Sequence, residues 1–191
     1  LGEDVEVWGA VGLVHDFDYE RWPTAADHPA RGMEILRERG WPEDVVEAVG
    51  SHAAYTGIPR NTPLRKALFA VDELCGFLMA VAYVRPTRSL ADVEVASVRK
   101  KMKDKAFARA VSRDDIVRGA EEFGLTLEES IEHCLWALRG AAPALRARAV
   151  RSSARTARAL RAAGRPVPRS VSGTLLSSRR SPTPRPPSPR D

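Results

Sequence analysis

The chain has 191 residues, of which 43% are apolar, and a formal net charge of +5. That length suits one ordinary domain with an extension. The charge is uneven, because residues 151–191 hold ten arginines and one acid, a net of +9, which leaves −4 for residues 1–150. The high isoelectric point therefore belongs to the C-terminal part, and it does not indicate that the folded part binds nucleic acid.

The first predicted helix covers Gly2–Val14, an apolar segment that runs directly into His15 and Asp16. Two shorter helices follow. Pro29–Arg39 has a proline at its first position and a glycine after its end, which is the expected asymmetry of a helix. Pro42 opens the next helix, which runs to about His52, and a loop rich in glycine and proline comes after it.

The most apolar predicted helix begins at Thr62-Pro63 and ends near Val84. Asp72 and Glu73 interrupt its apolar run, and the uncharged part that follows them is too short to cross a bilayer. We therefore expect a buried core helix and no membrane association.

Three more helices are predicted before the composition changes: Ser89 to about Lys103, Ser112 to Gly124, and Thr126 to Gly140, the last with a T-x-x-E capping box. No segment has a convincing strand pattern. The sequence thus predicts an all-α bundle of about seven helices over residues 1–140.

The composition changes after residue 140. Residues 141–163 are rich in alanine and arginine and have helical potential, whereas residues 165–191 consist mainly of proline, serine and arginine. A segment with so few large apolar residues cannot offset its chain entropy, so residues 141–191 are expected to be a largely disordered tail. Two interpretations stay open: a tail that binds nucleic acid or acidic lipid, and an appendage with no specific role.

Cys75 and Cys134 lie in apolar helical patterns and form no C-x-x-C pair, which predicts two buried free thiols in a reducing compartment. The acidic, amphipathic N-terminus does not resemble a signal peptide, so a cytoplasmic location is expected. The sequence has no P-loop, dinucleotide fingerprint or serine-hydrolase elbow, which excludes those classes.

Histidine and aspartate residues gather at the ends of predicted elements. His15 and Asp16 offer an imidazole nitrogen and a carboxylate to one point, a mixed donor set that suits divalent transition metals, although a capping role is the alternative. His28 opens one helix and His52 closes the next. Asp72 lies in the middle of the most apolar helix, where either a metal ion or a salt bridge from another helix would neutralise it.

These residues resemble the signature of the HD phosphohydrolase superfamily. Val11–Asp16 is similar to its apolar helix ending in His-Asp, and His28–Leu36 is similar to its H-P-x-x-G-x-x-I-L helix. The helix around Asp72 is similar to the one that bears the family's last aspartate. The resemblance to a group of small bacterial HD-domain hydrolases extends through Val98–Phe107 and Arg113–Ile116, and it covers the helical region but not the tail.

The resemblance implies a phosphomonoesterase or phosphodiesterase for a small phosphate ester or nucleotide, with one or two divalent ions of Mn, Fe, Zn, Ni or Co. It implies that His15, Asp16 and Asp72 hold a first ion, and that His28 and His52 hold a second. The family's first histidine normally precedes the His-Asp helix, and no histidine precedes His15. We therefore expect that the first helix and one ligand are missing. A catalytically impaired binding or regulatory domain is the alternative.

In the mechanism that the resemblance implies, Asp16 bridges two metals, and basic residues offset the charge of the substrate. Arg31 is the first candidate because it is close in sequence to His28; Arg60 and Lys103 are further candidates. Lys103 belongs to a lysine-rich helix end, for which a solvated surface is the alternative. The residues after the His-Asp pair either line the mouth of the pocket or serve as turn and capping residues: Asp18, Tyr19 and Glu20.

Overall fold

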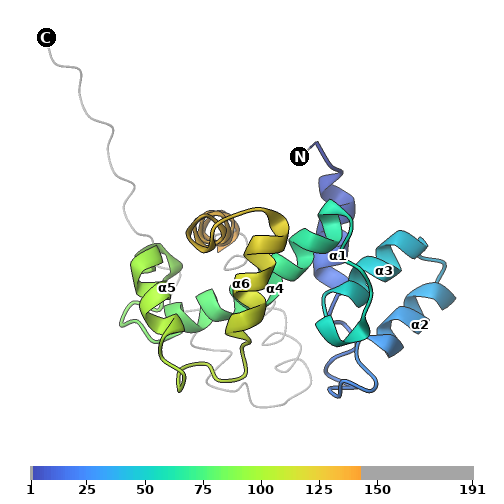
Figure 1. Ribbon diagram of the computed structural model, residues 1–191, viewed down its shortest axis with the longest axis horizontal. Helices are drawn as coiled ribbons and strands as arrows, with labels where there is room; N and C mark the ends of the chain where they lie inside the picture. The colour runs from blue at the N-terminus through green and yellow to red at the C-terminus, as the bar shows by residue number, and fades with distance from the viewer. Residues whose placement is uncertain (1, 143–191) are drawn as a thin grey trace, which may run out of the picture. The chain divides into compact units, whose positions relative to one another are not determined.

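The computed structural model describes residues 2–142, which contain helices, turns and loops but no strand, so the all-α prediction is confirmed for this range (Figure 1). The chain divides into two units, Leu1–Leu138 and Arg139–Asp191. The predictions for the tail lie outside the described residues from position 143 onward. None of the described helices has the length and apolar character needed to span a membrane.

The described residues hold six α-helices and a last helical stretch over residues 127–142, in agreement with the prediction of about seven. The α-helices are α1 (Val5–Val14), α2 (Ala30–Glu38), α3 (Glu43–Ser51), α4 (Pro63–Tyr83), α5 (Val95–Met102) and α6 (Arg113–Phe123), and the two short 3-10 turns are η1 (Ala54–Thr56) and η2 (Leu90–Asp92).

Side-chain caps set several of the helix starts. Thr62 caps α4 by accepting the N–H of Arg65, and the Thr126–Glu129 capping box is present, as predicted. The first helix begins at Val5 and not at Gly2, because the Asp4 carboxylate accepts the N–H groups at the first turn, as an N-cap does.

The prediction of one continuous helix from Ser89 to Lys103 is wrong. Ser89 caps only the short turn η2, and Val93 then takes an extended conformation with its side chain fully buried. The burial of Val93 takes the chain out of the helical path, and the helix restarts when Glu94 and Ser97 form a capping box for α5.

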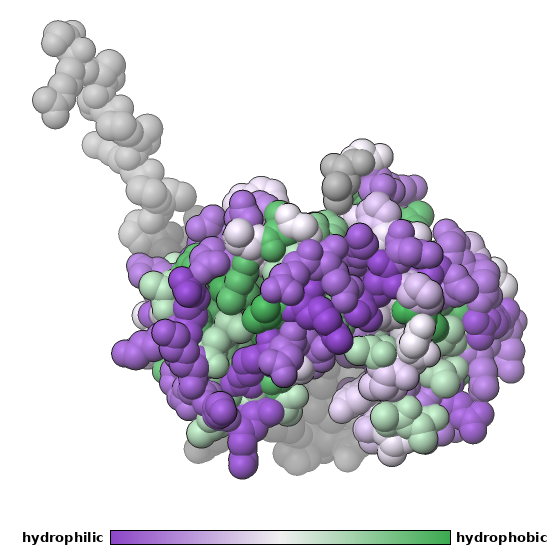
Figure 2. Space-filling model, viewed as in Figure 1, coloured by the Kyte–Doolittle hydropathy of each residue, from purple (hydrophilic) through white to green (hydrophobic). Residues whose placement is uncertain are grey.

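Two apolar clusters form the core, and α4 contributes to both. Leu68 of α4 packs with α1, α2 and α3, whereas Leu74 and Phe77 pack with α5, α6 and the last helical stretch. Each such fully buried side chain stabilises the fold by roughly 1.5–3 kcal/mol. The prediction that this segment is a buried core helix is confirmed. On the face seen in Figure 2, hydrophilic side chains predominate and hydrophobic ones form smaller patches.

Cys134 belongs to the cluster of Leu74 and Phe77, and Cys75 packs against that cluster. Cys134 is buried and Cys75 is partly buried, and neither forms a disulfide. This agrees with the prediction of free thiols, although Cys75 is less deeply buried than expected.

Gly119 allows α6 to approach α4 closely. A Cβ atom added at Gly119 would lie 2.7 Å from the Cα atom of Ala70, which is rigid backbone and cannot rotate away. Gly76, on the exposed side of α4, has no heavy atom within 4 Å of the corresponding position.

We predict that Gly119→Ala lowers the free energy of unfolding by roughly 1–3 kcal/mol, because the methyl group forces the two helices apart. The matched control Gly76→Ala should raise it by roughly 0.5–1 kcal/mol, since alanine loses less backbone entropy in a helix. Urea denaturation followed by circular dichroism measures both. Equal stabilities of the two variants would contradict the close packing of α4 on α6.

Candidate metal centre

Five predicted ligands meet where α1, α3 and α4 come together. His15 follows the last residue of α1, and Asp16 comes directly after it. His52 follows the last residue of α3, and Asp72 lies within α4. His28 stands just before α2. Three helix ends and the middle of α4 therefore bring these side chains to one place.

The ligand atoms form two groups, Asp16 with His28 and His52, and His15 with Asp16 and Asp72; within each group the atoms lie within 4.8 Å of one another. Asp16 belongs to both. Its Oδ1 is 3.2 Å from His28 Nε2 and 3.4 Å from His52 Nε2, whereas its Oδ2 is 3.4 Å from His15 Nε2. This is the arrangement of a carboxylate that can bridge two cations.

Main-chain carbonyls fix the orientation of two of the imidazole rings. His15 Nδ1 lies 2.9 Å from the carbonyl oxygen of Gly12, and His52 Nδ1 lies 2.5 Å from that of Val49. A carbonyl oxygen only accepts, so Nδ1 must carry the hydrogen in both rings. In a neutral ring the lone pair is then on Nε2, the atom that faces the cluster.

Asp18 fixes the third ring. Its side chain is fully buried, and Oδ1 accepts a hydrogen bond from His28 Nδ1 at 2.9 Å. Oδ2 accepts the N–H of Gly32, also at 2.9 Å. A side chain at position 32 would collide with Asp18, since a Cβ atom there would lie 2.8 Å from its Cγ. A carboxylate behind an imidazole is the usual support of a histidine that binds metal.

The three Nε2 atoms are suited to a cation. His28 Nε2 and His52 Nε2 lie 3.2 Å apart, and with the hydrogens on Nδ1 both present lone pairs to each other. His15 Nε2 is buried without a hydrogen-bond partner. Buried polar atoms in this state are unfavourable unless a positive charge lies between them. The residues present therefore fit a divalent metal ion with mixed nitrogen and oxygen ligands.

The electrostatics also favour positive charge at this point. Burial alone would lower the pKa of His15, but Asp16 and Asp72 outweigh it and raise the pKa to about 10. His15 and His52 in turn hold the pKa of Asp16 well below its usual range. Burial and the neighbouring Asp72 raise the pKa of Glu73. The carboxylates thus attract a cation, whether a proton or a metal ion.

Two of the three basic candidates form ion pairs outside the cluster, and the third is exposed. Arg31 is half exposed and forms an ion pair with Glu34 at 3.1 Å. Arg60 forms a two-point ion pair with Glu122, with distances of 2.6 and 2.7 Å. Lys103 is exposed at the C-terminal end of α5. The structure brings the five predicted ligands together, but it does not place these three among them, and their roles stay predictions.

A cleft of about 360 Å³ opens beside the cluster, with Asp16, His52 and Asp72 in its wall. Tyr19 also lines it, which agrees with one of the two roles that the sequence left open. Sequence reasoning missed Tyr55 and Glu73, two further lining residues. The only signal in the sequence that could have indicated them is closeness to a candidate ligand, because Tyr55 comes three residues after His52 and Glu73 directly follows Asp72.

A second cavity, of about 310 Å³, is walled mainly by apolar side chains, among them Trp8 and Leu68. It contains none of the five ligands. Its lining contains His133 and Cys134 but no carboxylate, so it lacks the mixed nitrogen and oxygen donors of the His-Asp cluster.

The chain matches no protein-family model, no curated protein and no solved structure. The functional assignment therefore depends on the geometry of the site.

Asp18→Asn tests the support of the His28 ring. The amide can accept from only one of the two donors that Asp18 now serves, so His28 loses its fixed orientation or Gly32 loses its partner. We expect the affinity for Zn²⁺ to fall roughly 10–100-fold, measured by competition with a chromogenic chelator. Asp27→Asn is the control, since Asp27 is a half-buried aspartate on the same segment that pairs with Arg31 and is not one of the candidate ligands. Unchanged affinity in Asp18→Asn would contradict the positioning role.

Proposed function

We propose that the protein is a metal-dependent phosphohydrolase of the HD type that acts on a small phosphate ester or nucleotide. One observation carries the proposal: three imidazole Nε2 atoms and two carboxylates face one another beside an open cleft, with Asp16 common to both groups. The resemblance in sequence to HD hydrolases concerns these same residues.

His15, Asp16 and Asp72 would hold one divalent ion, and His28 and His52 would hold a second together with Asp16. The bound metal would supply Lewis-acid chemistry, polarising a phosphoryl oxygen and lowering the pKa of water. Each group offers three protein ligands, a number typical of catalytic sites that leave a coordination position open.

The chain's own residues have distinct tasks in this proposal. The carbonyls of Gly12 and Val49 and the carboxylate of Asp18 keep the imidazole rings in place, so the site is organised before a ligand arrives. The Asp16 side chain is 49% exposed, and it is therefore the ligand most open to the cleft. Pre-organisation of this kind avoids reorganisation during the reaction.

A binding or regulatory domain with impaired catalysis is the second candidate. The observation that favours it is the single nitrogen ligand, His15, in the group with Asp16 and Asp72. Such a group would hold a metal less firmly than one with a further histidine. A cytoplasmic location belongs with either candidate. Binding of nucleic acid through the arginines of residues 151–191 is a separate proposal, which a strong dependence on salt would support.

We predict that the full chain, loaded with Mn²⁺, Fe²⁺, Zn²⁺, Ni²⁺ or Co²⁺, hydrolyses p-nitrophenyl phosphate or bis-p-nitrophenyl phosphate. Asp16→Ala should lower kcat/KM by at least about 100-fold, since it removes a ligand of both groups, and changes behind a ligand already cost 10–100-fold. Asp27→Ala serves as the control. If the metal-loaded protein hydrolyses neither ester, the result contradicts the proposed phosphohydrolase and favours the binding or regulatory domain.

A further inference from the structure

The cleft beside the cluster is acidic. Four carboxylates line it, Asp16, Asp72, Glu73 and Asp115, and among the described residues no lysine or arginine does. A metal would compensate the first two. Asp115 already forms an ion pair with Arg118 at 2.5 Å. Glu73 is the carboxylate whose charge is left for a ligand.

The contacts of Glu73 leave it without a close cation. Its Oε2 accepts the N–H of Ser112 at 3.3 Å, and it forms no ion pair within 4.0 Å in residues 2–142. The charge of Arg113 reaches Glu73, but the guanidinium of Arg113 donates to the carbonyl oxygens of Ala108 and Val111. A partly buried carboxylate in this position gains from a cationic ligand.

Two tyrosine rings line the same cleft. The side chain of Tyr55 donates its hydroxyl to the carbonyl oxygen of His28 at 2.8 Å, which holds the ring in place. Tyr19 stands edge-on to the ring of His28, with 5.1 Å between the centroids. Both residues are about half exposed, 58% for Tyr55 and 49% for Tyr19, so their rings are accessible to a ligand. Aromatic faces attract ammonium groups, quaternary ones in particular.

A separate observation ties this surface to the cluster. The side chain of His52 is only 5% exposed, and it lines the cleft with Nε2 directed at Asp16. The wall of the cleft therefore holds members of both ligand groups together with Glu73, Tyr19 and Tyr55.

We propose that the cleft selects phosphate esters whose organic part carries an ammonium group, with the phosphate at the His-Asp cluster and the ammonium at Glu73, Tyr19 and Tyr55. This inference rests on the proposed function. It also narrows it, because a nucleoside triphosphate would add negative charge to a cleft lined by carboxylates, whereas a zwitterionic ester matches both ends.

The test uses a charged and a neutral probe of the same shape. Choline and 3,3-dimethylbutan-1-ol differ in one atom, nitrogen for carbon, and in one positive charge. We expect the full, metal-loaded chain to bind choline at least about tenfold more tightly in calorimetry. Phosphocholine should likewise be hydrolysed with a kcat/KM at least about tenfold above that of 3,3-dimethylbutyl phosphate.

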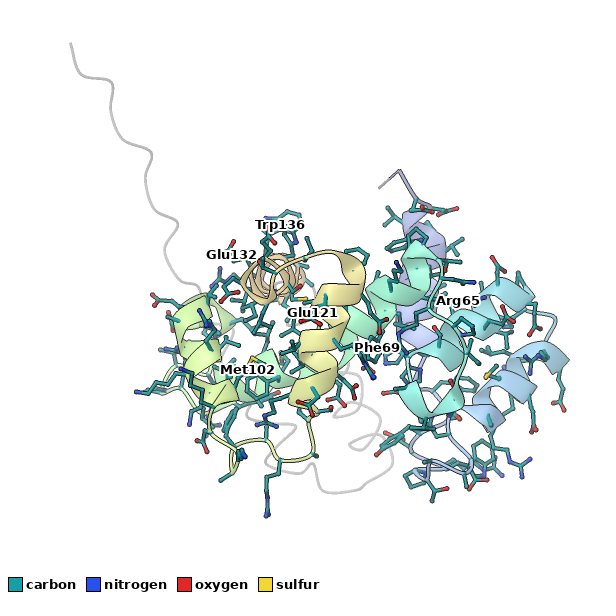
Figure 3. The ribbon with its side chains drawn as sticks, in the orientation of Figure 1. Arg65, Phe69, Met102, Glu121, Glu132 and Trp136 are labelled. Atoms are coloured by element: carbon teal, nitrogen blue, oxygen red, sulfur yellow. The ribbon has the colours of Figure 1, made fainter. Side chains whose placement is uncertain are left out.

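Glu73→Gln keeps a hydrogen-bond acceptor for Ser112 but removes the charge, so both preferences should disappear. Glu121→Gln, an exposed carboxylate of α6 outside the cleft, should keep them (Figure 3). Circular dichroism confirms that both variants are folded. Equal binding of the two probes, absence of choline binding, or a preference that survives Glu73→Gln would each overturn the inference.

The outcomes also separate this inference from the proposed function. Hydrolysis of both esters at equal rates, with no preference for choline, would leave the phosphohydrolase standing and refute the ammonium subsite. A Glu73-dependent preference for choline without hydrolysis of either ester would support the subsite and refute the hydrolase.

Discussion

The hydrogen bonds that the three Nδ1 atoms donate are the constraint on which the site depends. Main-chain carbonyls at the ends of α1 and α3 and the buried Asp18 each accept a hydrogen from an imidazole ring. Every Nε2 atom is consequently turned inward, to the point where Asp16 presents its two oxygens. Such a convergence of lone pairs and carboxylates is unfavourable in the absence of positive charge, and this is why the arrangement indicates a cation site.

The fold serves this constraint through α4. One end of this helix packs against α1, α2 and α3, and the other packs against α5 and α6, so Asp72 is held between two apolar clusters. His15 and His52 come from the ends of helices that pack on the first cluster. Close packing of α6 on α4, permitted by Gly119, brings Asp115 to the wall of the cleft. The packed core thereby holds the helices that carry the candidate ligands in fixed positions.

Much of the fold could be predicted from the sequence, because caps and apolar periodicity are local signals, as at Thr62 and Thr126. The break before α5 could not, since it arises from the burial of Val93 against residues distant in sequence. Four of the five candidate ligands were predictable from residue type and position at helix ends, and Asp72 from its place inside an apolar helix. The support by Asp18 was not, because it depends on Gly32, fourteen residues away, leaving room for the carboxylate. The ion pair of Arg60 was not predictable either, because its partner, Glu122, lies far along the chain.

The most direct test of the metal centre is the metal content of the chain itself. Protein purified anaerobically without chelator and measured by inductively coupled plasma mass spectrometry should carry about one or two divalent transition-metal ions per chain. Asp16→Ala, which removes the ligand common to both groups, should carry almost none, and the control Asp27→Ala should equal the wild type. A wild-type chain that holds no metal and takes none up on addition would contradict the account.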